Sequence, residues 1–298
     1  MAFELAHLRA LVAVVDTGTF TDAAIDLGVS QAAVSRTLKA LENDLGVTLI
    51  RRGPRHSVPT PVGLAVTDQA RRVLVEADRI AGVVGAGRTS LRLGYAWAAL
   101  GSHTVALQRR WAGAHPGTRL TLVRANTTTS GLAEGHCDAA VVRTPVDPDR
   151  FDSVVVGLER RLVAFATDDP WRRRRSLRMA EVAGRTVLID TRTGTTHLDL
   201  WPAGRGPRSV VHTGDVDEWL DAIAVGEGVG TTAEATRAHY PRPGVTYRLI
   251  ADGPRIPVSI AWRKDDPPPL VHSLIDLVTE LYRSGPPTSS TSHSAPRS

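Results

Sequence analysis

The sequence predicts a modular chain with an N-terminal all-α winged helix-turn-helix, a long linker helix and a C-terminal two-lobed α/β domain. Three observations predict this fold class. Two short amphipathic segments joined by a tight glycine turn lie between Thr21 and Gly46. A heptad pattern of small and branched apolar residues follows between Val66 and Val84. From Ser90 onward, strand-like segments alternate with helical ones, which is typical of α/β folds.

The segment GVSQAAVSRTLKALENDLG, from Gly28 to Gly46, is predicted to be an amphipathic helix. Its apolar residues recur at steps of four, three and four and form a single stripe: Val34, Leu38, Leu41 and Leu45. The opposite side carries short polar, methyl or cationic side chains: Ala32, Ser35, Arg36, Lys39 and Asn43. Ser30 is a good N-cap, so the positive end of the helix dipole lies beside Gln31. This face suits an anionic partner.

The residues before this helix complete a helix-turn-helix. Thr21 is the expected N-cap of a short helix that ends at Gly28. Its expected inward face consists of Ala23, Ala24 and Leu27. A preceding helical stripe supplies the rest of a three-helix core: Leu8, Leu11, Val12 and Val15. In this architecture the second helix of the motif enters the major groove of DNA with its N-terminus first.

A wing is predicted after the second helix. The segment VTLIRRGPRHSVPT contains two short extended stretches around Gly53-Pro54. We expect the wing arginines to contact phosphates or the minor groove, and the helix to contact base edges. The predicted DNA-binding residues are Ser30, Gln31, Ala32, Ser35, Arg36, Lys39, Arg51, Arg52 and Arg55. The alternative is a solvated charged face without a partner.

A long linker helix is predicted from Pro61 to 88, with Thr60 as its N-cap. Apolar residues recur in it at alternating steps of four and three, which predicts a dimerisation seam. The predicted seam consists of Val66, Ala70, Val73, Ala77, Ile80 and Val84. The alternative is a helix packed on its own domain, because Leu64, Leu74 and Ala81 widen the stripe beyond a strict seam.

The C-terminal part is predicted to form two strand-and-helix units. In the first, SLRLGYA, TRLTLVRA and CDAAVV are expected strands, with a helix ending near His115 and a short helix at SGLAEG. In the second, RLVAFAT, RTVLID and VGTT are expected strands around the helix DVDEWLDAIAVGEG. Strand–helix–strand order predicts parallel sheets with right-handed crossovers. IPVSIAW leads the chain back, and LVHSLIDLVTELYR is the expected last helix.

A ligand site is expected between the two lobes, because ligands of such folds bind beyond the carboxyl ends of strands. Three hydroxyl-rich loops meet this description: 96–102, 126–130 and 191–196. Thr195 or Thr196 is expected to cap a helix whose N–H groups, with Arg192, would hold an anion. The predicted effector-binding residues are Trp97, Ala98, Ser102, Thr128, Thr129, Arg192, Thr195 and Thr196. The alternative is that these threonines are ordinary caps and turn residues.

The stretch from Thr17 to Gly63 resembles the DNA-binding domain of the LysR-type transcriptional regulators. Several motifs occur at the spacing of that family: Gly-x-Phe-Thr-x-Ala-Ala, Ser-Gln-x-Ala-Val-Ser, Leu-Glu-x-x-Leu-Gly, and then Arg52, Thr60 and Gly63. The chain departs from the family at Ile50, where Phe is usual, and at Pro59-Thr60, where Leu-Thr is frequent. Looser motifs continue the resemblance to about Arg283.

The resemblance implies an effector domain similar to periplasmic binding proteins, and a linker helix that pairs with that of a second copy. It implies a transcriptional regulator controlled by a small-molecule effector. Family members often have a polar effector contact near Ala98, and an alanine beside Trp97 favours a larger, apolar effector. We expect a winged helix-turn-helix over 1–60, a linker over 61–88 and an effector domain over 89–284. Lobe I would span about 89–160 and 266–284, and lobe II about 161–265.

Composition agrees with a DNA-binding protein. The 298 residues are 42% hydrophobic and carry a net charge of +5, which suits an anionic partner. Cys137 is the only cysteine, so intramolecular disulfides and Cys-based zinc sites are excluded. The absence of long apolar runs predicts a cytoplasmic, nucleoid-associated protein without membrane contact. A Pro/Ser/Thr-rich tail, 285–298, is expected to be disordered.

The expected partners are double-stranded DNA at an operator or promoter, further copies of the chain in a homodimer or homotetramer, and a small-molecule effector. RNA polymerase is a further candidate partner. We expect no cofactor and no metal, since the histidines lack metal-ligand spacing. We expect no catalytic residues, because no nucleophile elbow or catalytic carboxylate pair occurs. Two alternatives stay open: an enzyme or ligand-binding protein with a DNA-binding appendage, and an architectural DNA-binding protein.

Overall fold

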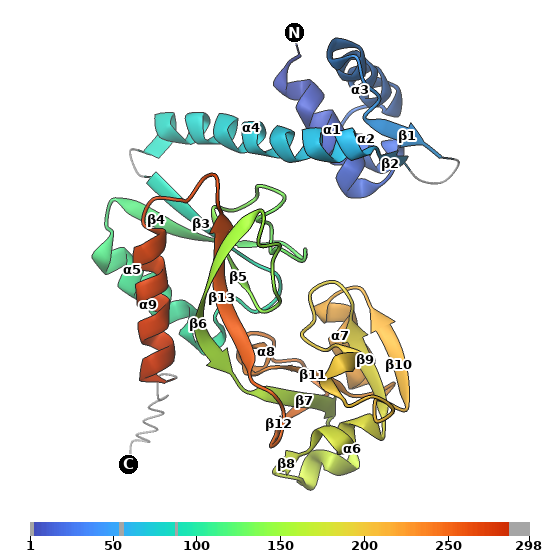
Figure 1. The fold of residues 1–298 in the computed structure, drawn as a ribbon, viewed down its shortest axis with the longest axis vertical. Helices are drawn as coiled ribbons and strands as arrows, with labels where there is room; N and C mark the ends of the chain where they lie inside the picture. Colours follow the sequence, from blue (N-terminus) through green and yellow to red (C-terminus); the bar gives the residue numbers. More distant parts are fainter. Residues whose placement is uncertain (1–2, 54–56, 87–88, 286–298) are drawn as a thin grey trace, which may run out of the picture. The chain divides into compact units, whose positions relative to one another are not determined.

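The computed structural model describes residues 3–53, 57–86 and 89–285. The chain divides into two compact units. Residues up to 89, together with Ala133–His136, form the first unit, and Ser90–Leu132 with the residues from Cys137 onward form the second. Figure 1 labels the elements of both. Of the expected disordered tail, 286–298 lie outside the described residues.

The first unit is a winged helix-turn-helix followed by a long helix, as predicted. Its elements are α1 (Leu5–Thr17), α2 (Phe20–Leu27), α3 (Gln31–Leu45), β1 (Ile50–Arg52), β2 (Ser57–Pro59) and α4 (Pro61–Ala86). β1 and β2 pair antiparallel and form the wing. The residues 87 and 88, included in the predicted linker, lie outside the described residues.

Local capping chemistry sets the helix boundaries of the first unit. Ser30 caps α3 as predicted, since its hydroxyl accepts the Ala33 N–H at 3.2 Å. The cap of α2 is Thr19 rather than the predicted Thr21, because the Thr19 hydroxyl accepts the Asp22 N–H at 3.0 Å. The glycine that follows each of the first three helices has a positive φ, which L side chains rarely adopt: Gly18, Gly28 and Gly46.

The core of the first unit is formed by the inward stripes of its helices. Most of the predicted residues are buried there, Val12, Val15, Leu27 and Leu45 are partly buried and pack against the cluster, and Ala70 of α4 completes it. The buried side chains include Leu8, Leu11, Val14, Ala23, Ala24, Val34, Leu38, Leu41 and Leu49. The start of α4 is therefore part of the helix-turn-helix core, and the Thr60 hydroxyl caps this helix by accepting the Gly63 N–H at 2.9 Å.

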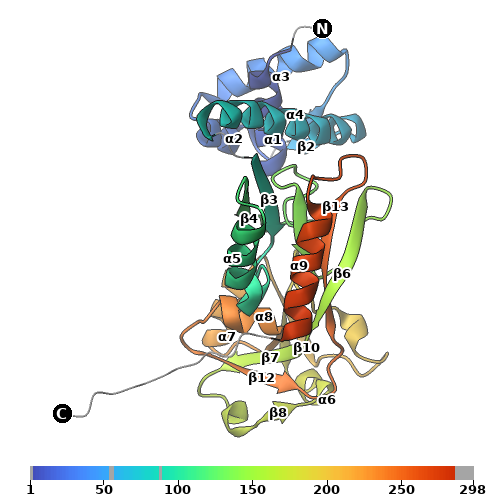
Figure 2. The same cartoon turned by 90° about the vertical axis from the view of Figure 1, so that its left-hand side faces the viewer.

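The second unit contains a five-stranded sheet with the strand order β4-β3-β5-β13-β6. Its strands are β3 (Thr89–Tyr95), β4 (Thr118–Arg124), β5 (Ala139–Val142), β6 (Phe151–Glu159) and β13 (Ile256–Arg263). Helices α5 (Thr104–Ala114) and α9 (Val271–Ser284) lie side by side on one face of this sheet (Figure 2). They bury Trp111 and Leu274 in a common core with the strands.

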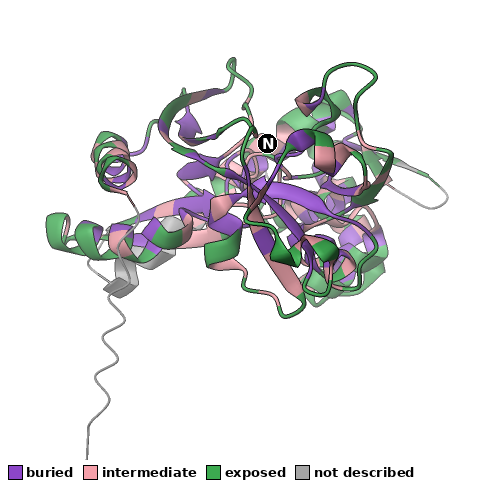
Figure 3. Ribbon diagram, turned by 90° about the horizontal axis from the view of Figure 1, so that it is seen from below, coloured by how far each residue is buried: buried purple, intermediate pink, exposed green. Residues whose placement is uncertain are grey.

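A four-stranded sheet, β11-β7-β12-β8, and a parallel pair, β9-β10, form the second lobe of this unit. Its strands are β7 (Arg161–Ala166), β8 (Ser176–Leu177), β9 (Thr186–Asp190), β10 (Ser209–Thr213), β11 (Gly230–Ala233) and β12 (Val245–Ile250). Its helices are α6 (Met179–Ala183), α7 (Val216–Ala224) and α8 (Glu234–His239). β7 and β11 are buried along their whole length, and Figure 3 shows buried residues concentrated along the strands.

The sheets are mixed, so the prediction of parallel sheets holds for some strand pairs and not for others. β3 and β5 pair in parallel as expected, but β13 runs antiparallel to β5 and β6. β7 likewise runs antiparallel to both of its neighbours. Whether two strands pair in parallel or antiparallel depends on long-range contacts, and the sequence pattern of a single strand does not reveal these.

The boundary predicted for lobe II also needs correction. β13 (Ile256–Arg263) belongs to the five-stranded sheet, whereas the predicted lobe II of about 161–265 includes it. The chain passes to the second lobe between Glu159 and Arg161 and returns between Ile250 and Ile256. Glu159 faces Ile256 in the register of the two strands, so the crossings lie next to each other.

The short helix predicted at SGLAEG is replaced by turns over 130–135. Three of its residues have positive φ: Ser130, Gly131 and Gly135. A right-handed helix requires negative φ throughout, so these residues cannot continue one.

Replacing Gly63 by alanine is expected to destabilise the first unit. An added Cβ would collide with the Leu49 carbonyl oxygen where α4 begins. We expect a loss of about 1–3 kcal/mol in the free energy of unfolding, measured by urea denaturation. Gly113→Ala is the matched control, since nothing lies within 4 Å of its Cβ position in α5. Equal stabilities of the two variants would contradict the prediction.

Candidate DNA interface and effector site

The exposed face of α3 gathers most of the residues predicted to contact bases. Gln31, Ala32, Arg36 and Lys39 are exposed, and Ser35 is half-buried. Ser30 is exposed at the helix start, but its hydroxyl is occupied by the cap. The face therefore combines two cations and an amide with small side chains that permit close approach to a partner. It can supply donors to phosphates and to the acceptors of guanine and adenine.

The wing is tied to α3 by one carboxylate. Glu42 Oε1 accepts the Leu49 N–H at 2.8 Å and the Ile50 N–H at 3.2 Å. On the other strand of the wing, the Ser57 N–H donates to the Gly18 carbonyl at 2.8 Å. These hydrogen bonds fix the position of the wing relative to α3. Glu42 belongs to the Leu-Glu-x-x-Leu-Gly motif, but its role as an acceptor for the wing was not predicted from the sequence.

Arg51 is exposed on β1, where it faces Val58 across the wing. Among the other predicted wing contacts, the Arg52 side chain and the whole of Arg55 lie outside the described residues.

Two exposed apolar residues beside α3 were missed from the sequence. Val29 directly precedes the Ser30 cap and is 50% exposed, and Ile25 on α2 is 75% exposed. Apolar side chains at a DNA interface contact the methyl group of thymine. The signal in the sequence was the apolar Val29 between the turn glycine Gly28 and the capping Ser30.

The predicted seam of α4 is divided by the structure. Ala70 is buried in the helix-turn-helix core and Val66 packs against it, so these two residues serve the chain's own fold. The cause is α1, which packs against the first half of α4. Val73 is 45% exposed and Ala77 is half-buried. The side chains of Ile80 and Val84 lie outside the described part of the chain.

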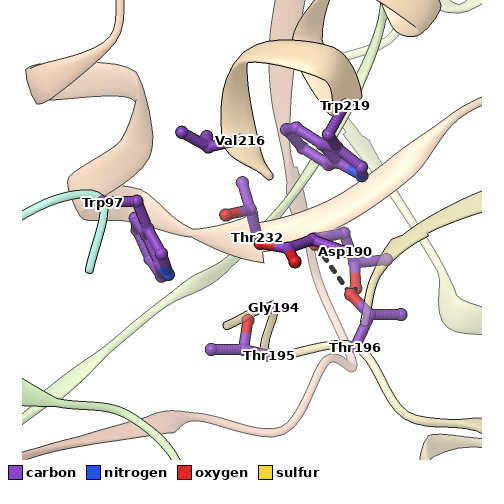
Figure 4. Close-up of a pocket in the computed structure, with 9 residues that line it drawn as sticks. Trp97, Asp190, Gly194, Thr195, Thr196, Val216, Trp219 and Thr232 are labelled. Atoms are coloured by element: carbon purple, nitrogen blue, oxygen red, sulfur yellow. Dashed lines mark hydrogen bonds between the residues drawn. The ribbon is translucent and has the colours of Figure 1, made fainter. Parts of the chain in front are cut away.

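Two neighbouring pockets lie in the crevice between the lobes of the second unit, and both include Trp97. The first is a small cavity of about 20 Å³ and is shown in Figure 4. It is lined by Trp97, Asp190, Gly194, Thr195, Thr196, Val216, Trp219, Thr231 and Thr232. The second is also a small cavity of about 20 Å³ and is lined by Ala96, Trp97, Thr127, Thr128, Ser130, Val141, Val142, Arg143, Thr144 and Thr193.

The structure brings together half of the predicted effector residues. Trp97, Thr195 and Thr196 line the first pocket, and Trp97 and Thr128 line the second. The other four do not line either pocket: Ala98 is buried in the core, Ser102 and Arg192 are exposed, and Thr129 is half-buried. The prediction from the sequence missed Asp190, although this residue is the last of the predicted strand RTVLID, and it missed the contribution of α7.

The predicted helix cap at Thr195 or Thr196 is wrong. The next helical segment is a short 3₁₀ turn, Leu198–Leu200, which starts after His197. The Thr196 hydroxyl instead bonds to Thr231, with 2.6 Å between the two Oγ1 atoms and 2.8 Å to the Thr231 carbonyl oxygen. Thr196 thus joins this loop to β11. No helix N-terminus is available here to hold an anion with Arg192.

Asp190 organises the loop that carries the threonines. Its Oδ1 accepts the N–H groups of Arg192 at 2.9 Å and Thr193 at 3.2 Å. Its Oδ2 accepts the Thr193 hydroxyl at 2.8 Å. The Thr195 hydroxyl oxygen, by contrast, is buried and has no hydrogen-bond partner among the described residues.

Three residues of the first lobe reach across the crevice to the second. Trp97 Nε1 donates to the Thr193 carbonyl at 3.1 Å. Asn126 bonds to the Thr193 hydroxyl at 3.2 Å and donates to the Gly214 carbonyl at 3.3 Å. Arg124 pairs with Asp217 on α7 at 3.1 Å. Hydrogen bonds within the chain therefore bridge the crevice at both pockets.

A buried ion pair, Arg143–Glu159, packs against the ring of Trp97. Arg143 donates to both carboxylate oxygens of Glu159, at 3.0 and 2.9 Å, and its guanidinium lies 4.6 Å from the Trp97 ring centre. Burial disfavours the Arg143 charge, but Glu159 outweighs it and raises the arginine's pKa. Burial, together with Glu159, raises the pKa of Tyr282, whose hydroxyl donates to Glu159 at 2.7 Å.

Arg161 is a second buried guanidinium of the second unit. It donates to the Thr195 carbonyl at 2.9 Å and approaches the Thr231 hydroxyl at 3.4 Å. Burial lowers its pKa to about 10, so it stays protonated at neutral pH. Arg161 thus holds the backbone of the loop 191–196 at Thr195, and it does not itself line either pocket.

Comparison with protein families gives two matches that together span most of the chain. The family "Bacterial regulatory helix-turn-helix protein, lysR family" matches residues 5–64. The family "LysR substrate binding domain" matches residues 85–283, which is more than half of the chain. The chain belongs to the LysR family. It is a LysR-type, DNA-binding transcriptional regulator with an effector-binding domain.

Similar regulators match this LysR-type chain along nearly its whole length. The transcriptional regulator BenM of Acinetobacter baylyi is 25% identical over 293 residues, covering 94% of this chain and 96% of BenM. IlvR of Caulobacter vibrioides is 28% identical and covers 93% of this chain and 98% of its own. The small neutral protease regulatory protein of Streptomyces coelicolor is 30% identical, covering 85% and 80%.

Solved structures show the same fold. CbnR, a LysR family transcriptional regulator, matches with a TM-score of 0.66 at 20% identity, covering 93% of this chain and 98% of CbnR. Full-length CbnR in complex with its target DNA matches with a TM-score of 0.61 at 22% identity, covering 93% and 99%.

The described residues contain neither a membrane-spanning helix nor a cluster of metal ligands. No helix described here has both the length and the apolar character needed to span a bilayer. Within the same part of the chain, no three His, Cys, Asp or Glu side chains are grouped as metal ligands would be.

Glu42→Ala is expected to loosen the wing of this LysR-type regulator. The change leaves the Leu49 and Ile50 N–H groups without their acceptor. We expect a loss of about 1–3 kcal/mol in the free energy of unfolding, measured by urea denaturation. Asp44→Ala, which removes an exposed carboxylate from the same helix, serves as the control and should change stability little. A Glu42→Ala protein as stable as the control would show that the wing does not depend on this contact.

Proposed function

We propose that this regulator recognises a specific operator through α3 and responds to a small molecule bound in the crevice beside Trp97. The observation that carries the proposal is the bridge from Trp97 Nε1 to the Thr193 carbonyl, which joins the two lobes at the pockets. A ligand entering either pocket changes the surroundings of this bridge. The effector would thereby shift the arrangement of the lobes and alter promoter occupancy or DNA bending. Couplings of this kind are typically about 1–3 kcal/mol.

The proposed DNA contacts divide into two classes. Gln31, Ala32, Ser35 and Arg36 would meet base edges, with Lys39 and Ser30 nearby. Arg51, Arg52 and Arg55 of the wing would contact phosphates or the minor groove and position the domain. Two exposed cations and small neighbours on one helix face support this assignment.

We further propose a homodimer or homotetramer, with 61–88 as the linker that pairs two copies. The exposed Val73 and the half-buried Ala77 support a seam that begins after the first half of α4. Pairing doubles the base contacts on an operator with two-fold symmetry. RNA polymerase is a proposed further partner.

The proposed setting is the cytoplasm, at the nucleoid, without membrane contact, catalysis or cofactor. The effector domain would span 89–284, with the helix-turn-helix over 1–60. An enzyme with a DNA-binding appendage is the competing function. Turnover of a small metabolite by the full chain would favour it over a regulator.

Alanine variants of Arg36 and Arg51 test the two classes of DNA contact. Arg36→Ala should lower affinity for the operator more than for random DNA, because a bidentate base contact is worth about 1–3 kcal/mol of discrimination. Arg51→Ala should weaken both alike and reduce the salt dependence, because a phosphate contact releases counterions. Mobility shifts on the chain's own upstream region and on a scrambled duplex, at several salt concentrations, measure both effects. Equal losses on the two duplexes for Arg36→Ala would refute its assignment.

A further inference from the structure

We propose that the effector-binding domain carries a second DNA contact: the arginine loop, residues 171–175, binds the phosphate backbone of duplex DNA outside the operator. The loop has the sequence Trp-Arg-Arg-Arg-Arg and directly precedes β8. This contact goes beyond the proposed function, which assigns DNA recognition to α3 and the wing. Three properties of the loop support it: its charge, its exposure and the hydrogen bonds that hold its backbone.

The segment that contains the arginine loop is strongly cationic. From Asp168 to Arg185 the chain has six arginines and three carboxylates, a net charge of +3 within 18 residues. The whole chain of 298 residues has a net charge of only +5. Positive charge concentrated on one short segment is typical of a surface that binds a polyanion.

Most of the charge of the loop is not neutralised by its surroundings. Arg174 pairs with Glu181 at 2.9 Å, and Arg185 pairs with Asp169 at 2.7 Å. Two of the three carboxylates of the segment are therefore already paired. The other loop arginines are exposed and form no ion pair with any described residue: Arg172, Arg173 and Arg175. These three guanidinium groups stay available to an external anion.

The backbone of the arginine loop is held by a further cation, Arg248 of β12. Its Nε donates to the Arg174 carbonyl at 2.6 Å, and its Nη2 donates to the Arg172 carbonyl at 2.8 Å. At the start of the loop, the Asp169 carboxylate caps a 3₁₀ turn by accepting the Trp171 N–H at 2.9 Å. The hydrogen bonds of Arg248 fix the loop through its carbonyl groups, so they leave the loop guanidinium groups unused and add one more positive charge.

Trp171 anchors the loop on its lobe. Its ring lies edge to face with that of Phe165, with 5.8 Å between the ring centres, and the Arg185 guanidinium lies 4.7 Å from its ring centre. The loop leads into β8, which pairs with β12 at the edge of the four-stranded sheet (Figure 1). The arginines thus extend from a fixed backbone, so little backbone entropy is lost when they bind a partner.

Duplex DNA is the polyanion that suits this surface. A guanidinium group matches a phosphate with two parallel hydrogen bonds, and such contacts position a protein without reading the base sequence. The chain belongs to a family of DNA-binding regulators. A second contact on the same duplex would be intramolecular, and the high effective concentration lets even a weak contact contribute to affinity.

The length of the duplex is the variable that tests this contact. The full chain is titrated with a duplex limited to the operator, as defined by base substitutions, and with one extended by several helical turns of scrambled sequence on each side. We expect the long duplex to bind more tightly. If two loop arginines contact phosphates, this advantage should shrink about tenfold between about 50 and 200 mM salt, because each contact adds about 0.9 to the salt slope.

A triple variant removes the free charges of the loop. Arg172→Gln/Arg173→Gln/Arg175→Gln should bind the operator duplex as the unaltered chain does and lose the advantage of the long duplex. Its Tm should not change, because these side chains form no ion pair with described residues. The matched control replaces three other exposed arginines of the second unit by glutamine: Arg119, Arg237 and Arg283. It lowers the net charge equally and should keep the advantage.

Three results would overturn the proposal. The first is an unaltered chain that binds both duplexes equally well. The second is an equal loss in the two triple variants, which would assign the effect to net charge. The third is a loop variant that keeps the full advantage of the long duplex; if it nevertheless lost activity in transcription, the loop would contact a protein instead. The proposed function is tested separately by the preference for the operator over a scrambled duplex of equal length, since a phosphate contact does not depend on sequence.

Discussion

The buried ion pair between Arg143 and Glu159 is the constraint on which the effector domain depends. Glu159 ends β6 at the point where the chain leaves the first lobe, and it also accepts the Tyr282 hydroxyl of α9. Arg143 follows β5, donates to the Ala99 carbonyl and supports the Trp97 ring. One pair thus fixes two strands, a helix and a crevice residue beside the crossing. Removing one partner of such a pair leaves an uncompensated buried charge, at a typical cost of about 3–5 kcal/mol.

Much of the DNA-binding unit could be predicted from the sequence, because its structure is set by local rules. Helix stripes, glycine stops and the caps at Ser30 and Thr60 are all readable within a few residues. The two extended stretches around Gly53-Pro54 predicted the wing, and the family resemblance agreed with the overall architecture. The role of Glu42 was not predictable, since its partners at Leu49 and Ile50 are met only after the chain turns.

Less of the effector domain could be predicted, because its pairing is non-local. β6 was missed and β13 was assigned to the wrong lobe, since a strand's pattern does not reveal which sheet it joins. At the crevice, Trp97 and the threonine loop were identified, but Asp190 and Trp219 were not. The expectation of an anion site followed from an expected helix start after Thr196, and the chain forms none there.

Thr193 forms hydrogen bonds to the first lobe through both its carbonyl and its hydroxyl. Its carbonyl receives the Trp97 indole, while its hydroxyl contacts both Asn126 and Asp190. These hydrogen bonds join the two lobes at the crevice. A ligand that binds in the crevice would have to replace the hydrogen bonds of Thr193 with bonds of its own. Its effect would then be a changed spacing between two lobes that are already in contact. The size of the response to a ligand would then depend on the strength of the hydrogen bonds that Thr193 makes with its neighbours.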